Sequence, residues 1–249
     1  MLNKLKNLTN SKFFHIVIII VIISIILFVA GVTILKYSVE GETNMPFKLT
    51  KIAVISSSEG IDKQNDEFKW AFDINQNNDI YIYIDKNQNY SKTEAIKSIN
   101  IQNINTESNS EEKIKIYKPS NTSQNSTFQN SEENEINSVE YLGDVQSNLK
   151  NLKISNQGGI IAFRCALNKL TEYKSNEEEI NHSELLKKSG IKNENLKTKI
   201  TFDLIVNLEN GTKFKTNINL NLPVDDVVEK GKTSTEFLDM SQYVFKRFT

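Results

Sequence analysis

The sequence predicts an antiparallel β-sandwich with one short helix, preceded by a single N-terminal transmembrane helix. Three observations lead to this prediction. One uninterrupted apolar run occupies residues 16–35, and apolar residues recur at every second position in many later segments. A single later segment, near residue 181, carries helix start and stop signals instead. Many short strands joined by polar turns are typical of a sandwich.

The apolar run reads IVIIIVIISIILFVAGVTIL and contains no charged residue. Twenty helical residues span roughly 30 Å, which is the thickness of a bilayer's hydrocarbon core. We therefore expect residues 16–35 to contact the lipid bilayer as an uncleaved anchor. The alternative is a cleaved signal peptide, whose apolar region usually has about 7–15 residues and ends in small residues. The segment 28–32 (FVAGV) is a poor match to such a cleavage site.

Charged residues on either side of the run predict its orientation. Basic residues precede the run and acidic residues follow it: Lys4, Lys6 and Lys12, then Glu40 and Glu42. Since basic flanks stay in the cytoplasm, residues 1–15 are expected to be cytoplasmic. Residues 36–46 form a short polar tether, and residues 47–249 form an extracytoplasmic β-rich domain. The prediction is a single-pass protein of the cell membrane.

Composition narrows the classes of partner. Beyond residue 36 the chain has 26 basic and 31 acidic residues, a net charge of −5. This mild acidity argues against a nucleic-acid partner and against broad electrostatic docking to anionic lipid. Cys165 is the only cysteine, so no intramolecular disulfide can form. The abundance of Asn, Ile and Lys suggests an AT-rich genome and favours a bacterial surface.

Period-two alternation predicts the strands of the domain. The alternating segments are 47–54, 68–74, 80–84, 99–101, 114–116, 161–167, 200–208 and 214–222. In the first of them the phase shifts near Lys51, as a β-bulge would cause. The Asn- and Asp-rich segments 73–79 and 85–89 are interpreted as turns between strands.

The last two strands predict a hairpin with a defined register. A two-residue turn at Asn210 and Gly211 would place Leu208 opposite Lys213 and mix the buried and exposed faces. A three-residue loop at 209–211 keeps the faces matched and gives Gly211 the left-handed position. It predicts these opposed pairs: Leu208 with Thr212, Val206 with Phe214, and Phe202 with Ile218.

Between the strands, one helix and two loops are predicted. Asn181 can cap a helix, with Glu184 at the capping-box position and Gly190 just past the end. Its Leu185 and Leu186 would then contact the sheet. The charged stretch 171–180 is expected to be a loop, and the low-complexity stretch 119–138 a polar flexible loop.

Candidate catalytic and metal-binding residues are few. Cys165 and His182 could form a thiol dyad, but Cys165 is in phase with core residues and His182 begins the predicted helix. The segment 73–79 resembles the start of a calcium loop, yet Ile84 stands where that loop needs a bidentate Glu. One Cys and one exported His cannot build the usual zinc ligand sets. We therefore expect no catalytic residue, no cofactor and no metal site.

Three aromatic residues have two open interpretations. Trp70 is expected to pack inside the sandwich, although it could instead form a recognition surface with Tyr81 and Tyr83. For the two tyrosines, recognition and simple coverage of the outer face of a sheet are equally consistent with the pattern.

Two functions remain after these exclusions. The first is a noncatalytic binding or assembly module at the cell surface, which binds another envelope protein or a glycan through sheet edges or loops. The alternative is an anchored hydrolase that uses a carboxylate pair, because such a pair needs only two acids at the right separation. A deep pocket with convergent acids would favour the enzyme, and a flat exposed patch would favour the module.

Overall fold

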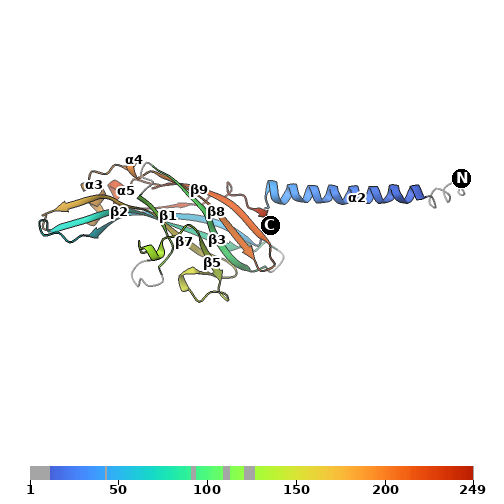
Figure 1. Cartoon of the computed structure of the whole chain (residues 1–249), viewed down its shortest axis with the longest axis horizontal. Coiled ribbons are helices and arrows are strands. Elements are labelled where there is room, and N and C mark those ends of the chain that lie inside the picture. The colour runs from blue at the N-terminus through green and yellow to red at the C-terminus, as the bar shows by residue number, and fades with distance from the viewer. Residues whose placement is uncertain (1–11, 43, 91–93, 109–112, 121–126, 249) are drawn as a thin grey trace.

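The computed structural model describes residues 12–42, 44–90, 94–108, 113–120 and 127–248. A single long helix extends from one end of a sandwich of two β-sheets (Figure 1). The sheets are antiparallel except for one parallel pair, β5 with β6. The predicted fold class is therefore confirmed.

The two sheets face each other across one main core. Sheet A contains, in spatial order, β10 (Lys232–Phe237), β1 (Phe47–Asp62), β2 (Trp70–Lys86), β7 (Gly159–Ser175) and β4 (Ile114–Tyr117). Sheet B contains, in spatial order, β11 (Lys246–Phe248), β9 (Lys213–Leu222), β8 (Thr198–Leu208), β3 (Ile96–Ser108), β5 (Val139–Gly143) and β6 (Lys153–Ile154). The inward side chains of both sheets form the core, as the alternation predicts.

The long helix is α2 (Lys12–Ile34). Together with the residues that follow, it gives an apolar span from Phe14 to Tyr37, and the side chains of that span are not buried by the rest of the chain. Among the described residues it is the one helix long and apolar enough to cross a membrane. It has the length and composition of a membrane anchor or a signal sequence.

The predicted hairpin register is confirmed. Val206 lies opposite Phe214, and Phe202 lies opposite Ile218. The Leu208 amide donates to the Thr212 carbonyl at 2.9 Å, so the loop is 209–211. Gly211 has φ +86°, the left-handed value that such a loop needs. The bulge in β1 is confirmed as well, since the register shifts between Leu49 and Lys51.

Two predicted turns or loops are wrong because strands run through them. The segment 73–79 is not a turn, since β2 continues without a break from Trp70 to Lys86. The stretch 171–180 is not all loop, since β7 extends to Ser175 and pairs with the start of β2. Both errors come from polar side chains that find partners on neighbouring strands. The second predicted turn, 85–89, is confirmed only in part, since β2 continues to Lys86 and the turn occupies residues 88–89.

A buried polar trio explains how β2 remains a strand across its polar stretch. Gln76 and Asn78 are fully buried and face inward, with Ser56 of β1 beside them. Gln76 Nε2 donates to Asn78 Oδ1 at 2.8 Å, and Asn78 Nδ2 donates back to Gln76 Oε1 at 3.0 Å. Ser56 Oγ donates to the same Asn78 oxygen at 2.7 Å. Because these groups satisfy one another, their burial costs little.

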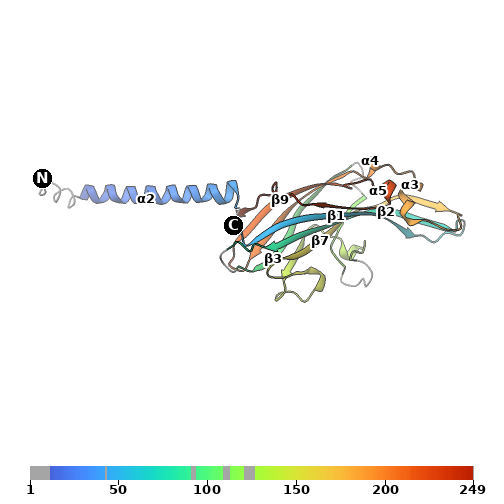
Figure 2. The same ribbon diagram turned by 180° about the vertical axis from the view of Figure 1, so that it is seen from behind.

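Beyond this trio lies a second, smaller apolar cluster. Three one-turn helices form its outer wall: α3 (Leu185–Lys188), α4 (Asn193–Leu196) and α5 (Val227–Lys230). Figures 1 and 2 both show them at the end of the sandwich opposite α2. The helix predicted from Asn181 is present in a divided form, a 3₁₀ turn (His182–Glu184) that leads into α3. Leu185 and Leu186 are buried against the sheet, as expected.

The three aromatic residues now have definite positions. Trp70 is half-buried and packs on this distal cluster rather than in the main core, with its ring stacked on Phe72 at 6.1 Å. Tyr81 and Tyr83 lie on the outer face of sheet A. The rings of Phe128 and Tyr81 pack together with their centroids 6.3 Å apart. Lys51 Nζ lies 4.3 Å from the centroid of the Tyr83 ring. The tyrosines therefore cover the sheet and are themselves covered.

The segment between α2 and β1 is bound to the C-terminal strand. After α2 the chain continues as a π-helical turn (Leu35–Glu40). Arg247 of β11 donates two hydrogen bonds to the Glu42 carboxylate. The bond from Nη2 to Oε1 is 2.8 Å long. The Arg247 guanidinium also lies over the Tyr37 ring, 4.8 Å from its centroid. The predicted tether is therefore short, and its end is bound to the domain.

Candidate binding face

The dyad suggested by Cys165 and His182 does not form. Cys165 is fully buried in the main core, and burial raises the pKa of its thiol to about 12. His182 is exposed and packs edge-on against Phe72 in the distal cluster, which is a different part of the molecule. A buried thiol with a raised pKa is a poor nucleophile, so the interpretation of Cys165 as a core residue is confirmed.

In the described part of the chain, the carboxyl groups whose pKa values shift favour the ionised form over the protonated form that a general acid needs. Glycoside hydrolysis needs one carboxyl group whose pKa is raised so that it stays protonated. Where pKa values of carboxyl groups shift in the described part of the chain, they are lowered by hydrogen bonds and nearby lysines. These groups are Glu172, Asp203, Asp225, Asp226 and Asp239. They are held in the ionised form.

Metal ligands do not gather within the described residues, where no group of three His, Cys, Asp or Glu side chains could hold an ion. The segment 73–79 has an extended backbone within β2, which does not wrap around a cation as a calcium loop does. Its Asp73 and Asp79 carboxylates have cationic partners, Lys63 and Arg164.

The outer face of sheet A carries a polar network that is nearly closed to solvent. Arg164 donates two hydrogen bonds to Asp79 on the neighbouring strand, from Nε to Oδ1 at 2.6 Å and from Nη2 to Oδ2 at 3.0 Å. Their side chains are only 10% and 13% exposed. Such a bidentate pair fixes both side chains, and removal of one partner would leave the other charge poorly solvated.

A segment far along the chain covers this network. Arg164 Nη1 donates to Asn130 Oδ1 at 2.9 Å, and Asn130 Nδ2 donates to Asn77 and Asn168 at 3.0 and 3.1 Å. The neighbouring Phe128 is 3% exposed and lies over the guanidinium of Arg164. Within the predicted polar loop 119–138, Phe128 and Asn130 thus pack onto sheet A.

A groove of about 570 Å³ lies beside this segment, and some of its charged lining residues form ion pairs. Lys115 pairs with Glu135 at 2.6 Å, and Asp73 pairs with Lys63 at 3.3 Å. Lys113 donates to the Leu170 carbonyl at 2.9 Å. These contacts engage part of the polar lining of the groove, which also includes Glu132 and Lys169.

The outer face of sheet B is open and polar. In an antiparallel sheet, directly opposed residues project from the same face, so the register arranges these side chains in cross-strand rows. One row runs Leu142, Ser98, Asn207, Lys213, Phe248. The next runs Glu140, Asn100, Ile205, Lys215, Lys246. A shorter third row runs Gln102, Asp203, Asn217.

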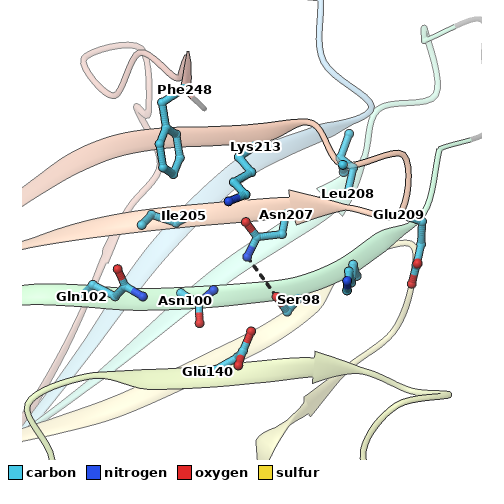
Figure 3. Close-up of a pocket in the computed structure, with 12 residues that line it drawn as sticks. Ser98, Asn100, Gln102, Glu140, Ile205, Asn207, Leu208, Glu209, Lys213 and Phe248 are labelled. Atoms are coloured by element: carbon cyan, nitrogen blue, oxygen red, sulfur yellow. Dashed lines mark hydrogen bonds between the residues drawn. The ribbon is translucent and has the colours of Figure 1, made fainter.

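These rows line a shallow groove of about 380 Å³. Figure 3 shows Phe248 and Lys213 at one end, the amides of Asn100, Gln102 and Asn207 in the middle, and Glu140 at the other end. Asn207 Nδ2 donates to Ser98 Oγ at 2.9 Å, which orients that amide. Amide, carboxylate and ammonium groups therefore meet on one surface, and the buried Ser98 hydroxyl orients one of the amides.

Asp203, in the third row, accepts hydrogen bonds that fix the side chains around it. Burial raises the pKa of the carboxyl, but hydrogen bonds from Asn103 and Asn217 and the charge of Lys215 outweigh burial and lower the pKa. Asn103 Nδ2 lies 2.8 Å from one Asp203 oxygen, and Asn217 Nδ2 lies 3.1 Å from the other. Asn103 has φ +52° at a bulge in β3, a conformation that Asn tolerates better than most residues.

Comparison with known proteins gives no further guide to the site. No protein-family model, no curated protein and no solved structure matches the chain.

The sequence already contained the signal for the face on sheet B. Asn100 and Gln102 alternate with the core residues Ile99 and Ile101, so they had to project outward. What the sequence did not show is which strands lie beside β3. Only the register brings Asn207 and Glu140 next to Asn100 and Ser98.

Proposed function

We propose that the chain is a membrane-anchored, extracytoplasmic, noncatalytic binding module that recognises a glycan through the outer face of sheet B. The observation that carries the proposal is the amide-rich groove of Asn100, Gln102 and Asn207. Sugar hydroxyls both donate and accept hydrogen bonds, and side-chain amides match them because each also does both. A face of this kind suits a polyhydroxylated ligand.

The composition of the groove favours a glycan over a protein partner. Centres of protein interfaces are enriched in Tyr, Trp and Met and depleted of charge. Here apolar side chains are few among the lining residues: Ile205, Leu208 and Phe248. The groove is open rather than deep, which is expected for a ligand that extends along the sheet rather than a small molecule enclosed in a pocket.

The apolar composition of α2 and the lysines that precede it support the proposed position of the domain. In the proposal α2 stays in the bilayer, with the lysine-bearing segment 1–15 in the cytoplasm and the sandwich outside. Protease added to intact cells should then digest residues 47–249 and leave the anchor. Full protection of the sandwich, or a mature chain that starts beyond Leu35, would contradict this topology.

A glycan array tests the binding activity. The full chain in neutral detergent micelles should retain a defined set of glycans, and the variant N100A/Q102A should lose at least about tenfold in affinity, since each lost hydrogen bond is worth about 1 kcal/mol. A matched control is K115A, on the outer face of sheet A, which should bind like the unmodified chain. Equal binding by all three proteins would reject the groove as the site.

The same array separates this proposal from a hydrolase. The face holds Glu140 and Glu209, so a carboxylate pair is the specific rival. Retained glycans should be recovered intact after long incubation. Release of shortened or reducing products, abolished by E140Q or E209Q, would replace the binding module with an enzyme.

A further inference from the structure

We propose that the membrane-proximal corner of sheet B binds the headgroups of anionic phospholipids. The proposal rests on the anchored topology proposed above and adds a second contact with the membrane, which involves the domain itself. The corner consists of Lys213, Lys215, Lys246 and Phe248, and it is called here the basic corner. Two of these residues, Lys213 and Phe248, also form the end of the groove proposed above for a glycan, so the two sites adjoin.

Positive charges are concentrated at the basic corner. Lys215 lies directly opposite Lys246 on the paired strand, and both project from the outer face. Like charges in this position destabilise a strand pair. The diagonal neighbour Lys213 adds a third positive charge opposite Phe248. A cluster of like charges on one face is stabilised when an anion binds between them.

Little within the described chain neutralises this cluster. Lys215 has one acidic partner, Asp203, at the long distance of 3.6 Å. Lys213 and Lys246 form no ion pair with any described residue. Arg247, which lies between Lys246 and Phe248 on β11, points to the other side and is already bound to Glu42. The basic corner therefore retains a net positive charge.

An aromatic side chain, Phe248, lies beside the lysines of the basic corner. Lys213 Nζ and Lys215 Nζ lie 6.0 and 5.7 Å from the centroid of the Phe248 ring. Phe248 is only partly buried, and Val244, which lines the same side of β11, is 45% exposed. Exposed apolar groups surrounded by lysines are the combination that interfacial membrane contacts use.

The basic corner lies close to the end of the apolar span. Tyr37 is the last residue of the apolar span, where aromatic side chains typically mark the membrane interface. Arg247 lies over that ring at 4.8 Å. Lys246 and Phe248 are its neighbours along the strand, with Cα atoms about 3.8 Å away. In Figures 1 and 2 the C-terminus accordingly lies beside the end of α2.

This local cluster differs from the overall charge of the domain. The net −5 beyond residue 36 argues against broad attraction to anionic lipid. Attraction decays within about 8 Å at physiological ionic strength, so the charges nearest the headgroups dominate. Three lysines at the corner can therefore bind anionic headgroups although the domain as a whole is acidic.

Lysine footprinting in nanodiscs tests the proposal with internal controls. The full chain is reconstituted into discs of phosphatidylcholine, with or without phosphatidylglycerol, and the acylation rate of each lysine is measured by mass spectrometry. Phosphatidylglycerol should slow acylation of the three corner lysines by at least about fivefold, the effect expected of one basic residue near an anionic surface. Lys174, Lys187 and Lys199 lie away from the corner and should react at unchanged rates. High salt should remove the protection.

Two outcomes would overturn the proposal. One is equal acylation of the corner lysines in both kinds of disc. The other is equal protection by millimolar inorganic phosphate in pure phosphatidylcholine discs, which would assign the corner to a free phosphate rather than a lipid. Failure of the topology is distinguishable, because a chain whose α2 does not insert would not copurify with either disc.

A set of lysine variants tests whether the corner lysines themselves bind the lipid, independently of any change of fold. K213Q/K215Q/K246Q should retain at least about tenfold less phosphatidylglycerol than the unmodified chain in detergent micelles, whereas K174Q/K187Q/K199Q should retain as much. The conservative variant K213R/K215R/K246R should restore retention. Retention by the glutamine variant equal to that of the unmodified chain would contradict the proposal.

Discussion

The outer faces of the two sheets contrast in how their polar groups are used. On sheet A, Arg164 and Asp79 bind each other and are covered by Phe128 and Asn130, so the polar groups are satisfied within the chain. On sheet B, Asn100 and Gln102 stand on an open face. Polar residues on the first face hold a distant segment in place, and those on the second remain accessible to a ligand.

The comparison shows why abundance of polar residues does not by itself mark a binding site. Both faces are rich in Asn, but Asn77 and Asn130 on sheet A bind partners from other strands. A site requires polar groups that the fold orients and leaves unsaturated, as Asn207 illustrates on sheet B, where one bond to Ser98 orients the amide.

The largest expected effect comes from breaking the covered face. Arg164→Ala leaves the Asp79 carboxylate without its partner under a covering segment, so we expect a loss of about 3–5 kcal/mol in the free energy of unfolding. Chemical denaturation followed by circular dichroism measures it. The control is Lys51→Ala, which removes a partly exposed ion pair with Glu236 and should cost much less than the Arg164 substitution. Similar losses of unfolding free energy in both variants would show that the covered pair stabilises the fold no more than the exposed pair does.

Removal of the cover itself should have the next largest effect. Phe128→Ala deletes a buried ring and should cost about 3 kcal/mol. Phe248→Ala, at the open face, removes a half-buried ring and should cost about 1 kcal/mol. Hydrogen exchange should also increase across residues 127–138 in the first variant alone. Unchanged exchange there would show that Phe128 does not hold the segment.

Substitution on the open face should separate binding from stability. N100A/Q102A should change the free energy of unfolding by no more than about 0.5 kcal/mol, because neither side chain is buried. The same variant should weaken glycan binding by at least about tenfold. A large loss of stability would mean that these amides serve the fold, as those on sheet A do.

The smallest effect should depend on pH. The pKa of Asp203 is lower in the folded protein than in the unfolded chain, so its stabilisation is present above the unfolded pKa of about 3.9. That stabilisation is lost as the pH falls through the folded pKa. Asp203→Asn should therefore be less stable than the unmodified chain near pH 7, by under about 1 kcal/mol. The difference should shrink as the pH falls below about 4 and vanish only once the pH is below the folded-state pKa. A difference that persists in acid would require another cause.

Much of the fold was predictable because its determinants are local. The loop 209–211 followed from matching apolar faces, and the bulge near Lys51 followed from a shift in phase. The burial of Cys165 followed from the alternation around it. In each case the relevant pattern lies within one strand or one hairpin.

The errors share a different cause. Gln76 and Asn78 resembled turn residues because their partner Ser56 is on another strand. Thr171 to Ser175 resembled a loop because the start of β2, which pairs with them, is about a hundred residues earlier in the chain. For the same reason the groove on sheet B could not be assembled from its separate polar positions.

The central claim, that sheet B carries the binding face of an anchored module, is tested most directly by site-specific photocrosslinking in intact cells. A photoreactive residue at Gln102 should give adducts of discrete mass, and the same residue at Lys115, on the outer face of sheet A, should give none. Adducts from Lys115 with none from Gln102 would contradict the account.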